Sequence, residues 1–337
     1  MFNCTKKRNM VDTIIMERKY NIMKQIRTAA IVGLGAIGGV VAPGLELALG
    51  HENLRVIAGG KRKERLENGI MINNKMWKFS VVDPKESTTP ADFVIFAVKN
   101  TQLKQAVEDA RNQIGSDTIV MSLLNGVESE EYLEENFYPE NVLYSIIRIP
   151  ALNVNGKISY PLKAKGISFN AKDNNKENEN VLAVKRLFEI AHIAHEVAED
   201  IHYTMWYKFM TNVSENQIAA ILGMPYRAFQ VSEHINVIRE MVSREVIAIA
   251  NAAGIGLSDK ELVQQKEYLM KMIPYGKPST LQDLEAGKKT EVDYFAGAVI
   301  RLGKKYHVPT PYNELFYHMI HALEEKTEIL ASIDQPN

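Results

Sequence analysis

The stretch that decides the fold is Ala29-Ala30-Ile31-Val32-Gly33-Leu34-Gly35-Ala36-Ile37-Gly38. Its first four residues predict a short buried strand, and the next six carry a G-x-G-x-x-G spacing at the start of a helical pattern. In such a unit Gly33 permits the tight turn, Gly35 lets the backbone approach a pyrophosphate, and Gly38 lets the helix pack close to the strand. The helix N-terminus then presents free N–H groups to the phosphates. We therefore expect Gly33, Leu34, Gly35, Ala36, Ile37 and Gly38 to bind a dinucleotide; the alternative is a glycine-rich turn without a ligand.

The end of the next predicted strand, residues 54–58, indicates which dinucleotide is bound. Units that bind NAD usually carry an Asp or Glu about 20 residues after the glycines, where it binds the ribose 2′-hydroxyl. Here the strand is followed by Gly59-Gly60-Lys61-Arg62-Lys63, with no acidic residue. Lys61 and Arg62 suit a 2′-phosphate, so NADPH/NADP is favoured over NAD(H). The alternative is that these cations begin a solvated helix and pair with Glu64.

Composition bounds the class of protein. The chain has 337 residues and a formal net charge of -1. This length favours two domains, and near-neutrality argues against a nucleic-acid partner. The single cysteine, Cys4, excludes an intramolecular disulfide and suits the cytoplasm. No apolar run reaches the ~18 residues of a transmembrane helix, so we expect no membrane partner, and no metal site is expected either.

Residues 1–26 form a separate N-terminal extension that is rich in lysine and arginine. The extension lacks the continuous apolar region of a secretion signal. Met23, just before the first strand, would be an adequate initiator. We expect this segment to carry no chemistry.

Strand and helix patterns alternate from residue 28 to about 195, whereas almost everything after Ile201 has helical periodicity. The first pattern predicts an α/β domain with a Rossmann-type doubly wound sheet, and the second predicts an all-helical domain. We place the NADP-binding domain at 27–198 and the helical substrate and catalytic domain at 199–337, with a hinge at 197–200. The expected strands include 71–82, 91–98, 117–123, 142–147 and 157–160, and the expected later helices are 201–222, 231–253, 258–271, 280–306 and 311–331.

The first long helix of the second domain carries Lys208, Asn212 and Asn216 at positions i, i+4 and i+8. This spacing places one cation and two amides along one helical face. Asn is a poor helix former, so two of them on one stripe call for a reason. The face either binds a small polar ligand or is a polar stripe exposed to solvent.

Further polar candidates lie at a helix start and after two strands. Ser279 suits an N-cap with Gln282 completing a capping box, and Glu291 suits the start of the next helix. Lys99 and Asn125 directly follow buried strands, and in open α/β sheets ligands bind at strand carboxyl ends. We expect the two domains to meet across a cleft that these residues line.

These residues resemble the ketopantoate reductase (2-dehydropantoate 2-reductase) family over about residues 29–323. The resemblance rests on a combination of motifs: Gly33-x-Gly35-x-x-Gly38, Ala97-Val98-Lys99, Asn125-Gly126, Trp206-x-Lys208-x-x-x-Asn212 and Thr290-Glu291-x-Asp293-Tyr294. It implies NADPH-dependent reduction of a 2-keto acid to a 2-hydroxy acid in pantothenate biosynthesis.

Carried over by position, the resemblance implies that Lys208 is the general acid. It implies that Asn212, Asn216 and Ser279 bind substrate, that Asn125 is shared between substrate and cofactor, and that Lys99 and Glu291 lie at the cofactor or the cleft. The chain departs from the family at Leu124, where Gln is frequent, at Gly59-Gly60, where an Arg usually ends the strand, and near Tyr226, where some members have a substrate Asn.

Two alternatives stand beside ketopantoate reduction. One is a paralogous reductase of another 2-keto acid, for which Tyr226 would change the shape of the pocket. The other, independent of Tyr226, is a non-catalytic NADP-binding regulator built on the same fold. The partner is in each case a small molecule, and a homodimer is compatible with the resemblance.

Overall fold

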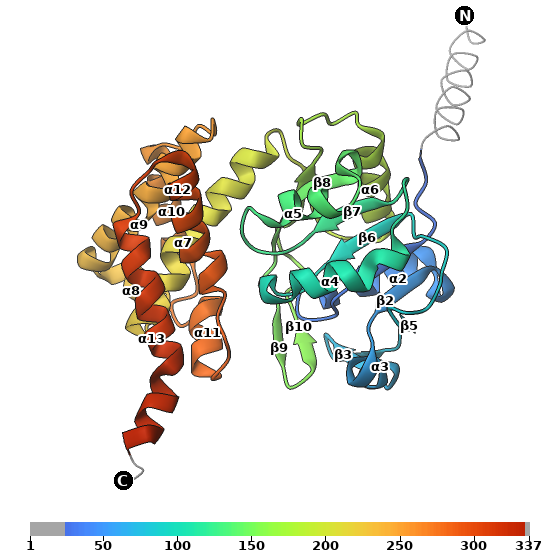
Figure 1. Cartoon of the computed structure of the whole chain (residues 1–337), viewed down its shortest axis with the longest axis horizontal. Coiled ribbons are helices and arrows are strands. Elements are labelled where there is room, and N and C mark those ends of the chain that lie inside the picture. Colours follow the sequence, from blue (N-terminus) through green and yellow to red (C-terminus); the bar gives the residue numbers. More distant parts are fainter. Residues whose placement is uncertain (1–23, 334–337) are drawn as a thin grey trace, which may run out of the picture. The chain divides into compact units, whose positions relative to one another are not determined.

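The computed structural model describes residues 24–333, which form two compact units (Figure 1). The first unit comprises the described residues up to Val98 together with 105–123 and 133–199. The second comprises 99–104, 124–132 and the chain from Asp200 onward. Two short segments that follow sheet strands therefore group with the helices. The predicted N-terminal extension lies, up to Met23, outside the described residues.

The first unit contains an eight-stranded sheet in the order β12-β11-β8-β7-β6-β1-β2-β5. The six strands from β8 to β5 are parallel neighbours, and β11 joins β8 in antiparallel orientation. Counted along the chain, their order is the 3-2-1-4-5-6 of a dinucleotide-binding sheet, which confirms the predicted fold class. The strands are β1 (Ala29–Val32), β2 (Leu54–Ile57), β5 (Ser80–Val82), β6 (Phe93–Phe96), β7 (Ile119–Ser122), β8 (Val142–Arg148), β11 (Gly166–Asn170) and β12 (His195–Val197).

Apolar side chains at alternate strand positions form the core of this unit. Phe93 and Ile95 of β6 are fully buried in one cluster with Val41 of α2 and Phe188 of α6. Burying each such side chain contributes about 1.5–3 kcal/mol, so this layer stabilises the sheet. The helices before residue 200 are α2 (Gly38–Leu49), α3 (Gly60–Glu67), α4 (Leu103–Ala110), α5 (Ser129–Asn136) and α6 (Glu179–Ile190), with short 3₁₀ turns η1 (His51–Asn53), η2 (Asn100–Gln102), η3 (Arg111–Gln113) and η4 (Pro139–Asn141).

A second, four-stranded sheet has the order β4-β3-β10-β9. Its strands are β3 (Ile70–Ile72), β4 (Lys75–Trp77), β9 (Leu152–Val154) and β10 (Lys157–Ser159). Of the strands expected over 71–82 and 157–160, β3, β4 and β10 form in this second sheet, whereas β5 joins the main sheet. Asn73 and Asn74 adopt positive φ angles of 45° and 63°, which closes the β3–β4 hairpin. The pairing of β3 with β10 is long-range, so local patterns do not reveal it.

The second unit contains a bundle of helices. They are α7 (Ile201–Leu222), α8 (Arg227–Val231), α9 (Glu233–Ala252), α10 (Asp259–Lys271), α11 (Ser279–Glu285), α12 (Ala296–Tyr306) and α13 (Pro311–Ile333), with the 3₁₀ turn η5 (Val292–Tyr294). Phe209 and Val213 of α7 pack against Val242 and Val246 of α9 in the core. Among residues 24–333, no helix has both the length and the apolar character needed to cross a membrane.

The single helix predicted over 280–306 is wrong. The structure has α11, the turn η5 and α12 in its place. Gly287 adopts a φ of +63° just after α11, a left-handed conformation that ends the helix. The intervening Glu291 directs its carboxylate to Asn100 instead of joining a helix. Residues 287–291, Gly-Lys-Lys-Thr-Glu, contain no apolar side chain, so the helical periodicity on either side does not continue through this break.

Candidate functional site

The glycine turn between β1 and α2 has the geometry that its spacing predicts. Gly33 has a φ of +99°, and a Cβ on it would lie 2.8 Å from the carbonyl oxygen of Ala97. A Cβ on Gly38 would lie 2.1 Å from the carbonyl oxygen of Gly33, so only glycine allows this close packing. A Cβ on Gly35, in contrast, would meet no atom within 4 Å. No side chain caps the N-terminus of α2. An open backbone beside an uncapped helix start fits a dinucleotide pyrophosphate.

The end of β2 presents both cations and an acid. Lys61 and Arg62 lie exposed in the first turn of α3, and neither has an ion-pair partner among residues 24–333. The alternative pairing with Glu64 does not form; the neighbouring Lys63 pairs with Glu86 at 2.8 Å. Asp83, which follows β5, places Oδ2 3.3 Å from the position of a Cβ on Gly59. The sequence analysis missed this acid because it comes from a neighbouring strand.

In the second unit, a chain of hydrogen bonds begins at Lys208. Its Nζ donates to Asn125 Oδ1 at 3.1 Å, and Asn125 Nδ2 donates to Glu291 Oε2 at 3.4 Å. The other carboxylate oxygen, Oε1, accepts from the backbone N (3.2 Å) and from Nδ2 (3.0 Å) of Asn100. The Asn125 side chain thus lies between Lys208 and Glu291, which are far apart in sequence. This arrangement orients a proton donor at a defined position.

Asn100 organises this chain of contacts. It is 4% exposed, and its Nδ2 also donates to the carbonyl oxygen of Asn125 at 2.9 Å. Glu291 is 8% exposed, so its carboxylate depends on these amide donors in place of water. Asn100 was not among the predicted site residues. Its signal was the same as that of Asn125, a polar residue directly after a buried strand.

Lys99 forms an ion pair with α11. Its Nζ lies 2.9 Å from Oδ1 and 2.8 Å from Oδ2 of Asp283. The Lys99 side chain is 46% exposed, so an anionic ligand can still reach it. The structure therefore adds Asp283 as the partner of this cation, a contact that nothing in the local sequence indicates.

The expected ladder on α7 is partly buried. Asn216 is 7% exposed, and its Oδ1 accepts from Ser279 Oγ (2.9 Å) and Thr280 N (3.3 Å). The alternative of a solvent-exposed stripe is therefore wrong at Asn216. The side chain of Asn212 has no hydrogen-bond partner within the described 24–333. Both amides thus keep N–H groups that are available to a ligand.

The expected N-cap role of Ser279 is also wrong. The N-cap position of α11 is Pro278, and no side chain caps this helix. Ser279 donates to Asn216 instead, and Gln282 Nε2 donates to the carbonyl oxygen of Lys277. Ser279 thus connects α11 to the polar face of α7.

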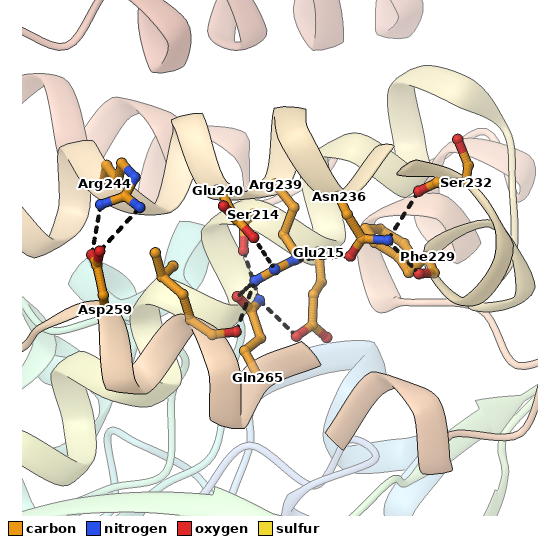
Figure 2. A network of polar contacts seen from close by, with 11 residues as sticks. Ser214, Glu215, Phe229, Ser232, Asn236, Arg239, Glu240, Arg244, Asp259 and Gln265 are labelled. Carbon is orange, nitrogen blue, oxygen red and sulfur yellow. Dashed lines mark hydrogen bonds and ion pairs between the residues drawn. The ribbon is translucent and has the colours of Figure 1, made fainter. Parts of the chain in front are cut away.

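A buried polar network lies beside this face (Figure 2). Gln265 of α10 lies between Arg239 of α9 and Glu215 of α7: Arg239 Nη1 donates to Gln265 Oε1 (2.6 Å), and Gln265 Nε2 donates to Glu215 Oε1 and to Ser214 Oγ (each 2.9 Å). Arg239 is fully buried, and burial lowers its pKa. Burial also raises the pKa of Glu215 to about 7, although the Gln265 hydrogen bond and the charge of Arg239 oppose this shift.

The raised pKa of Glu215 makes stability depend on pH. Between pH 4.5 and about 7, folded Glu215 keeps a proton that the unfolded chain releases, so the free energy of unfolding falls as pH rises through this window. Glu215→Gln removes the effect. We expect the free energy of unfolding of the variant, relative to that of the wild type, to rise by up to about 3 kcal/mol as the pH is raised from 5 to 8. Thermal unfolding at both pH values measures this difference. The exposed Glu64→Gln is the control, and a pH-independent difference contradicts the prediction.

Comparison with known proteins gives two matches that together cover most of the chain. Residues 29–171 match the family described as "Ketopantoate reductase PanE/ApbA", and residues 200–324 match "Ketopantoate reductase PanE/ApbA C terminal". Curated relatives are named 2-dehydropantoate 2-reductase. The relative from Lactococcus lactis subsp. lactis is 28% identical over 317 residues, which is 88% of this chain and 97% of the relative.

Solved structures share the fold. D-mandelate dehydrogenase with NADH and anilino(oxo)acetate has a TM-score of 0.78 at 23% identity, over 89% of this chain and 99% of that one. A dimeric ketopantoate reductase from Staphylococcus aureus has a TM-score of 0.73 at 18% identity, over 89% and 99%. Since the two family matches span well over half of its residues, the chain belongs to the ketopantoate reductase family and is an oxidoreductase of the 2-dehydropantoate 2-reductase type.

Proposed function

We propose that this protein catalyses the NADPH-dependent reduction of 2-dehydropantoate to pantoate, with Lys208 as the general acid. The observation that carries the proposal is the hydrogen bond from Lys208 Nζ to Asn125 Oδ1, with Asn125 in turn held by Glu291. Loss of NADPH absorbance on adding ketopantoate tests it. The expected result is turnover, and NADPH binding without turnover of any 2-keto acid would instead favour a regulator.

When bound, NADPH supplies a hydride to the C2 carbonyl carbon of the substrate. Negative charge then develops on the carbonyl oxygen, and a lysine ammonium, ordinarily protonated near pH 7, stabilises this charge and gives the proton. Asn125 keeps the Lys208 ammonium in place. The free N–H groups of Asn212 and Asn216 would bind the substrate carboxylate or hydroxyl. In our proposal Lys99 and Glu291 serve the cofactor side, and Ser279 acts with Asn216.

The domain roles follow from the same proposal. We assign cofactor binding to residues 27–198 and substrate binding and catalysis to 199–337. The segment 124–132, which groups with the helices, contributes Asn125 to the second role, whereas Lys99, in the segment 99–104, serves the cofactor. We further propose a homodimer in the cytoplasm. Cys4, the one cysteine of the chain, agrees with a reducing compartment.

The preference for NADPH rests on Lys61 and Arg62. Because both cations are exposed and unpaired in the described residues, we expect a Lys61→Ala/Arg62→Ala variant to raise the KM for NADPH by about tenfold or more, with little effect on NADH. The measurement is kcat/KM with each cofactor at low salt. A wild-type preference for NADH, unchanged in the variant, would overturn the assignment.

Asp83 provides the opposing test at the same strand end. Its carboxylate lies against Gly59, where it would repel a 2′-phosphate or accept a hydrogen bond from a ribose 2′-hydroxyl. Asp83→Asn should therefore shift the cofactor ratio toward NADPH, opposite in direction to the double variant. A shift in the same direction would show that the two groups do not face the same part of the cofactor.

Tyr226 supports a second candidate, the reduction of another branched or bulky 2-keto acid. A Cβ on Gly276 would lie 3.2 Å from the Tyr226 ring, so the ring packs on backbone that has no side chain. A bulky aromatic group thus occupies this position near the polar face of α7. A panel of 2-keto acids assayed with NADPH separates this candidate from ketopantoate reduction.

A further inference from the structure

Glu215 lies on the same helical face as the proposed catalytic lysine. It stands seven residues after Lys208 and three after Asn212, and such spacings place side chains on one side of a helix. Asn216 follows it directly on the adjacent part of this face. The residue is 6% exposed, so its carboxylate is almost completely withdrawn from water. A buried carboxylate beside a ligand-binding face is costly and needs partners.

The network around Glu215 leaves one carboxylate oxygen available. Oε1 accepts from Gln265 Nε2 at 2.9 Å. Oε2 has no hydrogen-bond partner in the described part of the chain, and it is not completely buried. Figure 2 shows the carboxylate held from the Gln265 side only. One oxygen is therefore fixed and the other is free.

Arg239 forms no hydrogen bond or ion pair with Glu215 among residues 24–333. Arg239 Nη2 pairs with Glu240 at 3.2 Å, and its other N–H groups donate to Asn236, Leu262 and Gln265. The charge of Arg239 lowers the pKa of Glu215, but the opposing effect of burial is larger. Oε2 of Glu215 therefore still lacks a hydrogen-bond donor.

Tyr226 lies close enough to Glu215 for the two to interact electrostatically. Burial raises the pKa of the Tyr226 hydroxyl, and the charge of Glu215 adds to this shift. No hydrogen bond between the two groups is present among the described residues. Each keeps capacity for a further partner, which is the arrangement expected around a small polar ligand.

We propose that Glu215 determines substrate specificity by accepting a hydrogen bond from a hydroxyl at the far end of the 2-keto acid, through its free Oε2. This inference rests on the proposed reduction of a 2-keto acid at Lys208. It defines the substrate class as 2-keto acids that carry a distal hydrogen-bond donor. An acid without the donor would leave Oε2 buried and unpaired, and sites built in this way discriminate strongly.

A matched substrate pair tests the proposal: ketopantoate and trimethylpyruvate, which differ only in the terminal hydroxyl. At pH 8, where Glu215 is ionised, we expect the wild type to show a kcat/KM about 10- to 100-fold higher for ketopantoate, the range of one hydrogen bond to a charged group. Glu215→Leu should bring this ratio to about one, because the hydroxyl of ketopantoate then loses its acceptor. Glu215→Gln, which can still accept from Gln265, should give an intermediate ratio.

Glu245→Gln is the control. Glu245 is also buried, but its carboxylate accepts from Tyr312 N and Asn313 N, away from the α7 face that carries Lys208. This variant should retain the wild-type ratio of kcat/KM for ketopantoate to kcat/KM for trimethylpyruvate. The comparison separates an effect on substrate specificity from the general effect of removing a buried carboxylate. A ratio unchanged in Glu215→Leu, with both acids reduced, overturns the role of Glu215 alone. If the wild type reduces neither acid, the proposed function itself fails, and this inference fails with it.

Discussion

We expect Lys208→Ala to lower kcat for the proposed 2-keto acid reduction by about 10²–10⁴-fold, the usual contribution of a positioned general acid. The effect falls on kcat because the ammonium acts most strongly on the charge that develops in the transition state. In the structure Lys208 Nζ donates to Asn125 Oδ1 at 3.1 Å, so the proton donor is already oriented. Steady-state kinetics with NADPH as the reductant measure the loss.

Two further variants show whether the loss is chemical or structural. Lys208→Arg keeps the charge but is a much weaker acid, so it should bind substrate and still turn over slowly. Lys277→Ala removes a lysine of the same unit that pairs on the surface with Glu285, and it should retain wild-type kcat. A kcat reduced less than threefold in Lys208→Ala would exclude this residue as the general acid.

Gly35→Ala weakens NADPH binding by about 10- to 100-fold without unfolding the protein. An added Cβ at this position meets no atom within 4 Å, and the φ of Gly35 lies outside the left-handed region, so alanine fits the free protein. The methyl group would instead occupy the space that the pyrophosphate needs. Calorimetric titration with NADPH measures the change in affinity, and a thermal melt checks the fold.

Gly38→Ala is the matched comparison in the same turn. Its Cβ would lie 2.1 Å from the Gly33 carbonyl oxygen, so α2 must shift, at a cost of about 1–3 kcal/mol in stability. The two alanines therefore separate a ligand effect from a packing effect. If Gly35→Ala binds NADPH like the wild type, residues 33–38 do not hold the pyrophosphate.

Local sequence determined the glycine turn and the limits of the helix α7, because both depend on residues that are neighbours in the chain. The G-x-G-x-x-G spacing predicted a turn in which Gly33 and Gly38 have no room for a side chain, and both positions show this in the structure. Asp200 caps the N-terminus of α7, and Gly223 ends the helix in a left-handed conformation. The limits of α7 at 201–222 therefore agree with the prediction. Periodicity and caps act over a few residues, which is why the sequence reveals them.

Tertiary structure decided the partners of the polar residues. Serine is common at helix N-caps, yet Ser279 donates a hydrogen bond to Asn216, 63 residues away. Glu291 lies in the break between α11 and α12, and its carboxylate binds Asn100, 191 residues away. Glu215 gave no local signal, since its burial arises only where α7, α9 and α10 pack together. Sequence determined the elements and the residue types that chemistry requires. Which side chains meet depends on long-range packing, because the contacts that order them form only in the folded chain.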